Sequence, residues 1–561
     1  MRSKNLAWLL ALFLVLAMFL AACAGDGEPE ESEGSTDDSA SEEEDSSSED
    51  DEASGEEDDS STEDDAASEG DGEENVVIAV PAELSSLSAH GSNDVPSGNV
   101  RSNIYETLIT LDDEGNPQEN LATNWEQLDE TTWQFEIREG VTFHDGSDLN
   151  AEVVKMNFDR LLDEEIGSQG ASIVSAIDTV EAVDEYTLEV TLQYAFSPIL
   201  NHLAHNNTSI MSGEIIEADA EAVESGDEID QYINSNPIGT GPFMFDTYTP
   251  GDQIVLARND DYWGDVAEIE TITFRTIPET STRLAELETG AVHIADAIEP
   301  DNIDRVSEMD GTSVLQESST SLNFIAFNTQ VEPLNDERVR RAISLAIDQS
   351  QIIDGIYDGT SIPATGPIPP GVLGHDEDIE GLGYDLEEAQ SLLEEAGYGD
   401  GFEISLKTNS DNPQRMNMAT YAESALSELN ITVNIEGMEF GAFIEDAAEG
   451  QTEMFILGWS TPTMDGDYST HLLFHSDNHG MPGNMTFFDD PEVDEILDEA
   501  RREADLDTRM ELYSEASEML IQKAPMVFVN HTEYLLGVSD SIEGFGVAPN
   551  GIYQFNDVTV E

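Results

Sequence analysis

The feature that most constrains this chain is a long acidic tract near its N-terminus. Residues 26–74 contain 26 aspartates and glutamates and no lysine or arginine, mixed with serine, glycine, alanine and threonine. Such a segment cannot bury enough apolar surface to offset the entropy of ordering. We expect a solvated tether over residues 23–75, with an end-to-end distance of about 40 Å that charge repulsion extends further. A folded domain must therefore begin near residue 76, and the alternative for the tract is an acidic tail that binds a basic partner or cations.

An apolar run precedes this tract. Arg2 and Lys4 are followed by apolar residues from Leu6 to Ala22 and then by Cys23, the only cysteine. This order is typical of a secretory signal peptide over residues 1–22. The Leu-Ala-Ala-Cys sequence at 20–23 resembles a bacterial lipobox, which predicts that Cys23 carries lipid and anchors the protein to the outer side of the cell membrane. The alternative is an uncleaved anchor helix with Cys23 buried, and a single cysteine excludes an internal disulfide.

The rest of the chain is itself strongly acidic. Of the 122 acidic and 19 basic residues, 96 acidic and 17 basic lie after residue 75, which leaves a net charge of −79. Self-repulsion of this size must be screened, and molar salt shortens the Debye length to about 3 Å. Because only Lys155, Lys407 and Lys523 remain as lysines, we infer a halophilic source. The same charge excludes nucleic acid as a partner.

Short β-rich runs alternate with helical ones from residue 76 onward. Period-two and buried-strand patterns predict strands at 75–80 and 132–137 and a hairpin at 178–192. Apolar residues that recur every three or four positions predict helices at 336–348, 386–396, 415–429, 491–503 and 506–522. Asp385 and Gly397 are the expected N-cap and C-cap of one of these helices. Strands scattered through the whole length indicate an α/β protein whose lobes are built from non-contiguous segments.

Six short segments, in their order along the chain, resemble the peptide, nickel and glutathione solute-binding proteins of ABC importers, a family of extracellular receptors. They are IYETL at 104–108, LATNW at 121–125, IREGVTFHDG at 137–146, GTGPF at 239–243, RNDDYW at 258–263 and RVRRAI at 338–343. The resemblance implies an α/β, two-lobed fold like type II periplasmic binding proteins, with a hinge and an extra subdomain in the first lobe. Lobe I would span 76–332 and 530–561 with the subdomain at 116–237, lobe II would span 333–529, and the hinge strands would be 322–328 and 527–531.

The same resemblance implies the function. A monomeric receptor, not an enzyme, would capture a dipeptide, oligopeptide or glutathione-like ligand between the lobes without a cofactor. It would deliver the ligand to an ABC permease and ATPase complex. Binding of a nickel or metal chelate, or of another small solute, is the alternative within the family. A surface hydrolase and a signalling or adhesion lipoprotein are alternatives from other classes.

The resemblance also implies ligand contacts after the strand at 455–459. Peptide binders of the family place there an aspartate that pairs with the ligand α-ammonium, and Asp465 and Asp467 are the candidates, of which we favour Asp465. A buried carboxylate needs a cationic partner, which an ammonium group supplies. The alternative for both is a solvated Asp-Gly turn. Trp459 is a candidate for the pocket floor, or else a core residue.

The ligand carboxylate needs a basic partner. Dipeptide binders carry an arginine in the loop that corresponds to residues 409–414, but this loop is short and has none. Lys407 or Arg415 would have to replace it, although Arg415 also fits a surface charge at a helix start. We add Asn484 as a candidate ligand contact.

Two motifs suggest a metal, although we expect none. His471, His475 and His479 recur at a spacing of four, which on a helix would align three imidazoles for zinc or nickel, but Pro482 and nearby glycines disfavour a long helix. Residues 376–387 imitate a calcium loop, with a glutamate at the fifth position and no entering helix.

Overall fold

The computed structural model describes residues 75–480 and 483–561, so the predicted signal peptide, Cys23 and the acidic tether lie outside the described residues. The predicted helix at 386–396 is confirmed as α11 (Leu386–Ala396), with Asp385 as N-cap and Gly397 as C-cap at a φ of +91°. The predicted hairpin is confirmed as β6 (Ile177–Asp184) and β7 (Thr187–Leu192). The other four predicted helices are α9 (Glu337–Leu345), α12 (Pro413–Ser427), α15 (Pro491–Arg502) and α16 (Leu506–Lys523).

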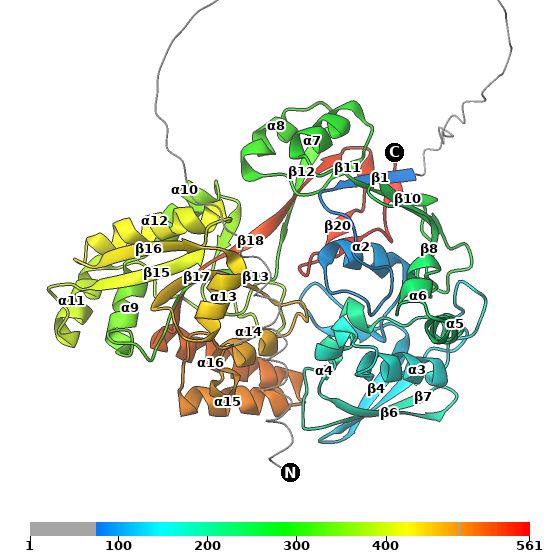
Figure 1. Ribbon diagram of the computed structural model, residues 1–561, viewed down its shortest axis with the longest axis horizontal. Helices are drawn as coiled ribbons and strands as arrows, with labels where there is room; N and C mark the ends of the chain where they lie inside the picture. Colours follow the sequence, from blue (N-terminus) through cyan, green and yellow to red (C-terminus); the bar gives the residue numbers. More distant parts are fainter. Residues whose placement is uncertain (1–74, 481–482) are drawn as a thin grey trace, which may run out of the picture. The chain divides into compact units, whose positions relative to one another are not determined.

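The largest sheet has twelve strands and connects the two halves of the structure (Figure 1). Its path is β16 (Thr432–Met438), β15 (Glu403–Asn409), β17 (Met454–Ser460), β13 (Ser321–Phe327), β18 (Met526–Ser539), β11 (Ile294–Ala295), β1 (Asn75–Val80), β10 (Thr271–Thr276), β9 (Gln253–Arg258) and β8 (Phe243–Thr249). Two further strands, β12 (Thr312–Ser318) and β14 (Ser361–Pro363), pair with β18 beside this path. We use "second lobe" for the part from β16 to β13 with its helices, and "first lobe" for the part from β11 to β8 with its own.

Strand β18 is shared by the two lobes. Its first half pairs antiparallel with β13 and its second half with β12. Only Ser319 and Thr320 separate β12 from β13, so the two strands and β18 form a ribbon that passes from one lobe to the other (Figure 1). At the crossing, Ser319 Oγ donates a hydrogen bond to the carbonyl of Thr532 at 2.5 Å. The segments 322–328 and 527–531 lie on the second-lobe side of this crossing, and their role as hinge strands stays a prediction.

The second lobe is a sheet with helices on both faces. Along β13, Ile325 and Phe327 belong to a core with α9, α11 and α12, whereas Phe324 and Ala326 belong to another core with α13 (Phe440–Ala448), α14 (Gly466–Phe474), α15 and α16. A strand that is buried on both faces is a nearly continuous apolar run, as the sequence of β13 is.

The first lobe has a core around its part of the large sheet and a second core in a smaller sheet. Helix α2 (Val95–Ile104) packs in the former. The smaller sheet, in the order β4 (Ala122–Asp129), β5 (Thr132–Ile137), β7 and β6, packs on α3 (Ala151–Leu162). The remaining α-helices of the described residues are α4 (Ile199–His202), α5 (Gly213–Ser225), α6 (Gln231–Ser235), α7 (Thr280–Thr289), α8 (Ile303–Ser307) and, in the second lobe, α10 (Gln349–Ile356). The predicted residue limits of the lobes and the subdomain stay a prediction.

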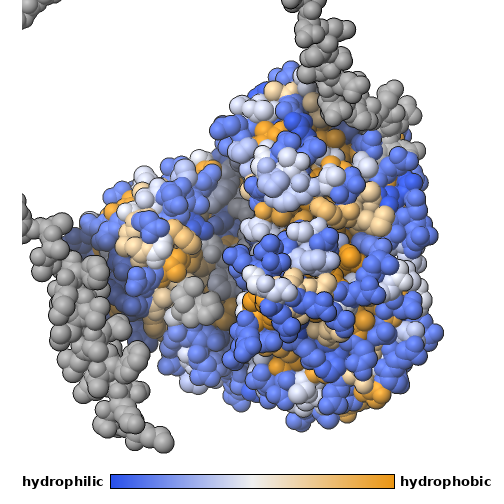
Figure 2. All heavy atoms as spheres, turned by 45° about the vertical axis from the view of Figure 1, so that its right-hand side comes forward, coloured by the Kyte–Doolittle hydropathy of each residue, from blue (hydrophilic) through white to orange (hydrophobic). Residues whose placement is uncertain are grey.

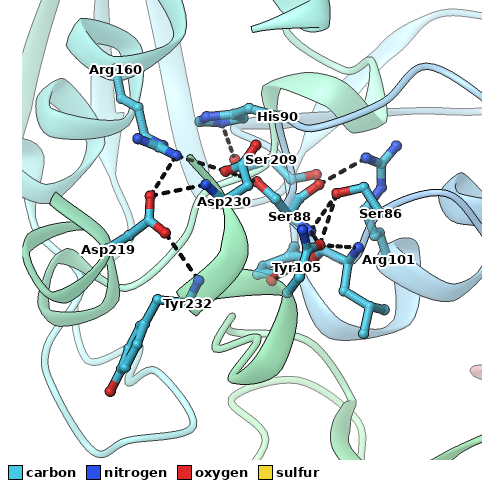
Figure 3. A network of polar contacts seen from close by, with 12 residues as sticks. Ser86, Ser88, His90, Arg101, Tyr105, Arg160, Ser209, Asp219, Asp230 and Tyr232 are labelled. Carbon is cyan, nitrogen blue, oxygen red and sulfur yellow. Dashed lines mark hydrogen bonds and ion pairs between the residues drawn. The ribbon is translucent and has the colours of Figure 1, made fainter. Parts of the chain in front are cut away.

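A buried polar network fixes the chain on both sides of the start of α2 (Figure 3). Arg160 donates to Asp230 at 2.7 Å, and Ser88 Oγ donates to the same carboxylate at 2.7 Å. Arg101 in turn donates to the carbonyls of Ser88 and Ser92, each at 2.9 Å. These contacts hold residues 88–92 against α2 and α3. The next residues along the chain, 93–95, line a cavity.

The surface fits an acidic protein in water. On the face in Figure 2 hydrophilic residues predominate, and hydrophobic residues form small separate patches. Within the described part of the chain, no helix combines the length and the apolar character needed to cross a membrane.

Candidate ligand-binding site

Two cavities lie where residues of the two lobes face each other. The first, of about 360 Å³, is lined by residues 93–95 of the first lobe and residues 458–460 of the second, and we call it the aromatic cavity. The second, of about 330 Å³, is lined by residues 296–298 of the first lobe and Arg415 of the second, and we call it the Arg415 cavity. Tyr534 of β18 lines both cavities, so they adjoin along the strand that joins the lobes.

Trp459 lies in the wall of the aromatic cavity, at the end of β17. Its ring centroid is 5.5 Å from that of Tyr468 on α14, with 32° between the ring planes, and its Nε1 donates to the Tyr468 carbonyl at 3.2 Å. Both side chains are half-buried. The ring is therefore partly packed and partly open to the cavity, as an amphipathic floor residue would be. The predicted ligand contact stays a prediction.

Arg415 reaches the second cavity with most of its donors unused. The Asn412 side chain caps α12 by accepting from the Arg415 N–H at 3.0 Å, and this bond fixes the position of the Arg415 backbone. Its side chain makes one hydrogen bond, from Nη1 to Asn409 Oδ1 at 2.9 Å, and its Nε is buried without a partner. Among the described residues no carboxylate forms an ion pair with it.

The position of Arg415 depends on a neighbouring glycine. A Cβ on Gly458 would lie 2.9 Å from Arg415 Nη2, so a larger residue at this position of β17 would displace the guanidinium. Burial lowers the pKa of Arg415, and Tyr357 and Asp411 act in the opposite direction. Because an arginine stays protonated in proteins, this is a half-buried cation that no carboxylate of the described residues contacts as an ion pair. It can accept a planar carboxylate through two parallel hydrogen bonds.

Asp465, the favoured ammonium anchor, is already neutralised inside the second lobe. Its side chain is fully buried and caps α14, where Oδ1 accepts from the Asp467 N–H at 2.9 Å. Oδ1 also accepts from Tyr513 Oη at 2.7 Å, and Arg509 Nη2 lies 3.2 Å from Oδ2. Burial, followed by the Asp465 charge, raises the pKa of Tyr513, so the phenol remains a donor. Asp465 does not line either cavity, and its anchoring role stays a prediction that this geometry does not support.

Asp467 is also paired. Arg501 donates to its two carboxylate oxygens at 2.9 and 2.8 Å. Burial by itself would raise the pKa of Asp467, but the Arg501 guanidinium outweighs it and holds this pKa below its ordinary value. Arg501 also touches the first lobe, because its guanidinium lies 5.2 Å from the ring of Phe196 and its carbonyl accepts from the Ser197 N–H at 2.9 Å. The pair therefore belongs to a contact between the lobes, and the anchoring role of Asp467 likewise stays a prediction without support.

Two other candidates, Asn484 and Lys407, have hydrogen-bond partners within the fold, and their ligand contacts stay predictions without support. Asn484 is fully buried, and its amide nitrogen donates to three backbone carbonyls while its oxygen accepts from the Phe488 N–H and from Thr486 Oγ1. Its whole hydrogen-bonding capacity is used to shape its own loop. Lys407 donates to Asp446 Oδ2 at 2.8 Å and to the Gln451 carbonyl at 2.9 Å. Neither side chain lines the two cavities.

The three histidines do not form one row. His471 and His475 stack with centroids 4.3 Å apart, and their Nε2 atoms lie 3.7 and 3.6 Å from Asp498 Oδ1. His479 instead bonds to the carbonyl of Phe488 at 2.9 Å. Within residues 75–480 and 483–561, His471, His475 and Asp498 are the only three groups close enough together to hold a metal.

The hydrogen bonds of these rings disfavour a metal. Nδ1 of His471 accepts from the Asn478 side chain, and Nδ1 of His475 accepts from the Asp477 N–H. Because Nδ1 accepts, the N–H of each ring is on Nε2, the atom that faces Asp498. A metal ligand needs the opposite tautomer, with Nδ1 as donor. The loop at 376–387 lacks the entering helix of a calcium-binding loop, because no helix lies between the end of α10 at Ile356 and residue 376.

Three residues of the cleft were not predicted, namely Asp94, Tyr468 and Tyr534. The sequence Asn-Asp-Val-Pro at 93–96 is a typical helix start. That pattern explains an aspartate as an N-cap and gives no sign that Asp94 also lines a cavity. Tyr468 and Tyr534 lie in a helix and a strand whose patterns do not distinguish a cavity wall from a core.

Comparisons with known proteins agree with this architecture. A family model described as bacterial extracellular solute-binding proteins, family 5 Middle, matches residues 116–481. The glutathione-binding protein GsiB of Escherichia coli K12 is 28% identical, covering 87% of this chain and 95% of GsiB. Among solved structures, HbpA2 from Haemophilus parasuis is 27% identical with a TM-score of 0.80, covering 87% of this chain and 100% of that one. DppA from Helicobacter pylori, in complex with the peptide STSA, is 28% identical with a TM-score of 0.69, covering 87% and 98%.

A dipeptide binding protein from Pseudoalteromonas sp. SM9913, in complex with Met-Leu, is 25% identical with a TM-score of 0.68. That match covers 87% of this chain and 100% of the other. These proteins span nearly the whole described part of the chain, first lobe and second lobe alike.

Proposed function

Because this chain belongs to the bacterial extracellular solute-binding proteins of family 5, we propose that it captures a peptide between its lobes and delivers it to an ABC permease and ATPase complex. The peptide, dipeptide and glutathione ligands in the names of its relatives support this ligand class. Receptors of such importers do not transform their ligands, so the protein is a carrier and not an enzyme.

One observation carries the choice of ligand class. Arg415 is a half-buried cation with unused donors, and it lines a cavity between the lobes of a protein that is otherwise strongly acidic. A ligand carboxylate is the group that its planar guanidinium binds best. The aromatic cavity beside it, with Trp459 and Tyr468, offers apolar surface for a side chain. A peptide carries both kinds of group.

The first test is to identify what the protein carries. Purified protein is denatured, the released small molecules are identified by mass spectrometry, and binding is measured by calorimetry with Met-Leu, Ser-Thr-Ser-Ala and glutathione. We expect at least one of these to bind and to be recovered intact. Failure of all three to bind, with no peptide released from the protein, would contradict the proposal. Hydrolysis of the probes would point to the surface hydrolase instead.

The second test concerns Arg415. Replacing it by alanine removes one partner of a charge pair, and because the group is only half-buried we expect affinity to fall about tenfold to a hundredfold. Arg305→Ala is the matched control, since Arg305 is exposed, lies 3.8 Å from the exposed Glu288 and does not line the cavity. Equal losses in the two variants would show that Arg415 does not contact the ligand.

The N-terminal region supplies the location. We propose that residues 1–22 are a signal peptide, that lipid on Cys23 holds the monomer at the membrane, and that residues 24–75 let the receptor reach its importer. The lipobox pattern and the acidic composition of the tract support this. Cys23→Ser should release the protein from the membrane fraction into the medium, and retention of the variant would contradict lipid anchoring.

A further inference from the structure

The two lobes touch directly beside α4 and α15. The carbonyl of Arg501 in α15 accepts from the Ser197 N–H of the first lobe at 2.9 Å, and the Arg501 guanidinium lies 5.2 Å from the Phe196 ring. Asn201 of α4 donates through its Nδ2 to the carbonyl of Met464 in the second lobe at 3.3 Å. We call this contact the lobe latch, and its residues are Phe196, Ser197 and Asn201 of the first lobe and Met464 and Arg501 of the second.

The latch lies across the aromatic cavity from the ribbon that joins the lobes. In Figure 1 the ribbon, with β12 and β18, crosses near the top, whereas α4, α14 and α15 lie lower. The cavity is lined both by Tyr534 of β18 and by Tyr468 of α14, so it extends from the ribbon toward the latch. In a rotation about a hinge, the parts farthest from the hinge move most. Opening of the lobes about the ribbon must therefore break the latch.

Both walls of the aromatic cavity continue directly into the latch. In the second lobe Tyr468 lines the cavity, and the preceding residue, Asp467, is held by two hydrogen bonds from Arg501. In the first lobe His205 and Asn206 line the cavity, and only two residues separate them from the end of α4. The latch therefore clamps the two walls against each other.

The first-lobe side of the latch contains buried polar atoms without a hydrogen-bond partner among the described residues. They are Ser197 Oγ, Asn201 Oδ1 and His202 Nε2, on residues that are at most 8% exposed. A permanently packed interface satisfies such groups, because a buried donor or acceptor without a partner is unfavourable. When the lobes separate, water can reach these atoms, and this hydration offsets part of the lost contact. The latch is therefore a contact suited to being made and broken, as contacts between mobile domains are.

We propose that the lobe latch holds the receptor closed without a ligand and sets the rate at which a bound ligand leaves. This rests on the proposed function and goes beyond it, because the latch residues do not line either cavity apart from the walls that they clamp. Arg501 acts as a positioning residue, since Asp467 balances its charge and fixes its planar guanidinium beside the Phe196 ring. Because the latch adds the same free energy of closure whatever the ligand, it slows the release of every ligand by the same factor.

The test uses variants that weaken the latch from either lobe. Phe196→Leu removes the aromatic face from the first lobe and leaves the ion pair of Arg501 intact. Phe158→Leu is the matched control, because Phe158 on α3 belongs to the same apolar core and is not a latch residue. Arg501→Lys is a second variant, which keeps the positive charge and loses the planar guanidinium.

Closure is measured in the ligand-free, full-length protein by energy transfer between two dyes. The dyes are attached at Val183→Cys of the first lobe and Tyr384→Cys of the second, both exposed positions, in a Cys23→Ser background that removes the only native thiol. Release of Met-Leu and of Ser-Thr-Ser-Ala is followed by stopped-flow dilution of the loaded protein, with the fluorescence of Trp459 in the cavity wall as the signal.

We expect Phe196→Leu and Arg501→Lys to lower the energy transfer, and Phe158→Leu to leave it as in native protein. Phe196→Leu should speed the release of both peptides by one common factor of about threefold to thirtyfold. Unchanged transfer in both latch variants, an equal drop in Phe158→Leu, or faster release of one peptide only would overturn the proposal. If neither peptide binds, the proposed function fails, and the energy transfer of the ligand-free protein still decides whether the latch closes the lobes.

Discussion

The ion pair between Asp467 and Arg501 gives a test that separates structure from ligand binding. The Asp467 side chain is 5% exposed and the Arg501 side chain 21%, with two hydrogen bonds between them. Removing one partner of a fully buried pair costs about 3–5 kcal/mol. Because a fifth of Arg501 reaches water, and asparagine can still accept one of the two bonds, we expect Asp467→Asn to lower the free energy of unfolding by about 2–3 kcal/mol.

The melting temperature translates this into a measurable shift. The entropy of unfolding is about 2.1 cal/mol/K per residue, or roughly 1 kcal/mol/K for the whole described chain and about 0.4 kcal/mol/K for the second lobe alone. Asp467→Asn should therefore lower Tm by about 2–3 °C if the chain unfolds as one unit, and by about 5–7 °C if the second lobe unfolds by itself. Scanning calorimetry distinguishes the two cases. Asp159→Asn, which breaks an exposed pair with Lys155, is the control and should change Tm by less than about 1 °C.

Binding by the same variant completes the test. If Asp467 is structural, the ratio of affinities for Met-Leu and N-acetyl-Met-Leu stays as in native protein. A variant with unchanged Tm but equal affinity for the two peptides would refute the reasoning and restore Asp467 as the ammonium anchor.

Three further predictions follow from charge and packing. Tm should rise steeply between about 0.01 M and 1 M salt, because screening relieves the repulsion from the net charge of −79, and a flat Tm would contradict this. The free energy of unfolding should fall as pH drops from about 6.5 toward 4. Burial lowers the pKa values of His90, His471 and His531 to about 4, so in this range the unfolded chain binds protons that the folded chain does not. Each histidine contributes up to about 1.4 kcal/mol per pH unit, and urea unfolding at several pH values measures the loss. Gly458→Ala should displace the Arg415 guanidinium and lower peptide affinity about tenfold, while Tm changes by about 1 °C or less. Calorimetry with Met-Leu measures the affinity. The control is Gly397→Ala, which should lower stability and leave affinity unchanged.

The sequence predicts local structure well where one physical signal dominates. α11 has its apolar spacing, its Asp385 cap and its Gly397 stop all in sequence, and the structure has the same limits. β13 is harder, because a short apolar run does not tell a buried strand from a buried helix segment. Its partners β17 and β18 lie more than a hundred residues away in the chain, and only their pairing defines the ribbon between the lobes.

The partners of the candidate site residues are harder to predict from the sequence than the helices, because the chain is so rich in acidic residues. In a chain with 96 acidic residues after position 75, an aspartate near a tryptophan carries little information, and its role depends on where the few cations lie. Arg501 and Arg509 reach Asp467 and Asp465 from α15 and α16, at separations that no local pattern reveals. The resemblance indicates the region after Trp459, whereas tertiary packing decides which cation pairs with each aspartate there.

The buried arginines show why Arg415 is the informative one. Among the described residues, Arg101, Arg283 and Arg340 also lack a carboxylate partner, but each donates to at least two backbone carbonyls, although Arg101 Nε has no partner. Arg415 makes one bond to Asn409 and otherwise faces a cavity. Leaving a half-buried cation under-bonded costs stability, and a protein with so few cations had acidic residues in abundance with which to neutralise it. A ligand carboxylate that completes its hydrogen bonds is the simplest physical reason for this arrangement.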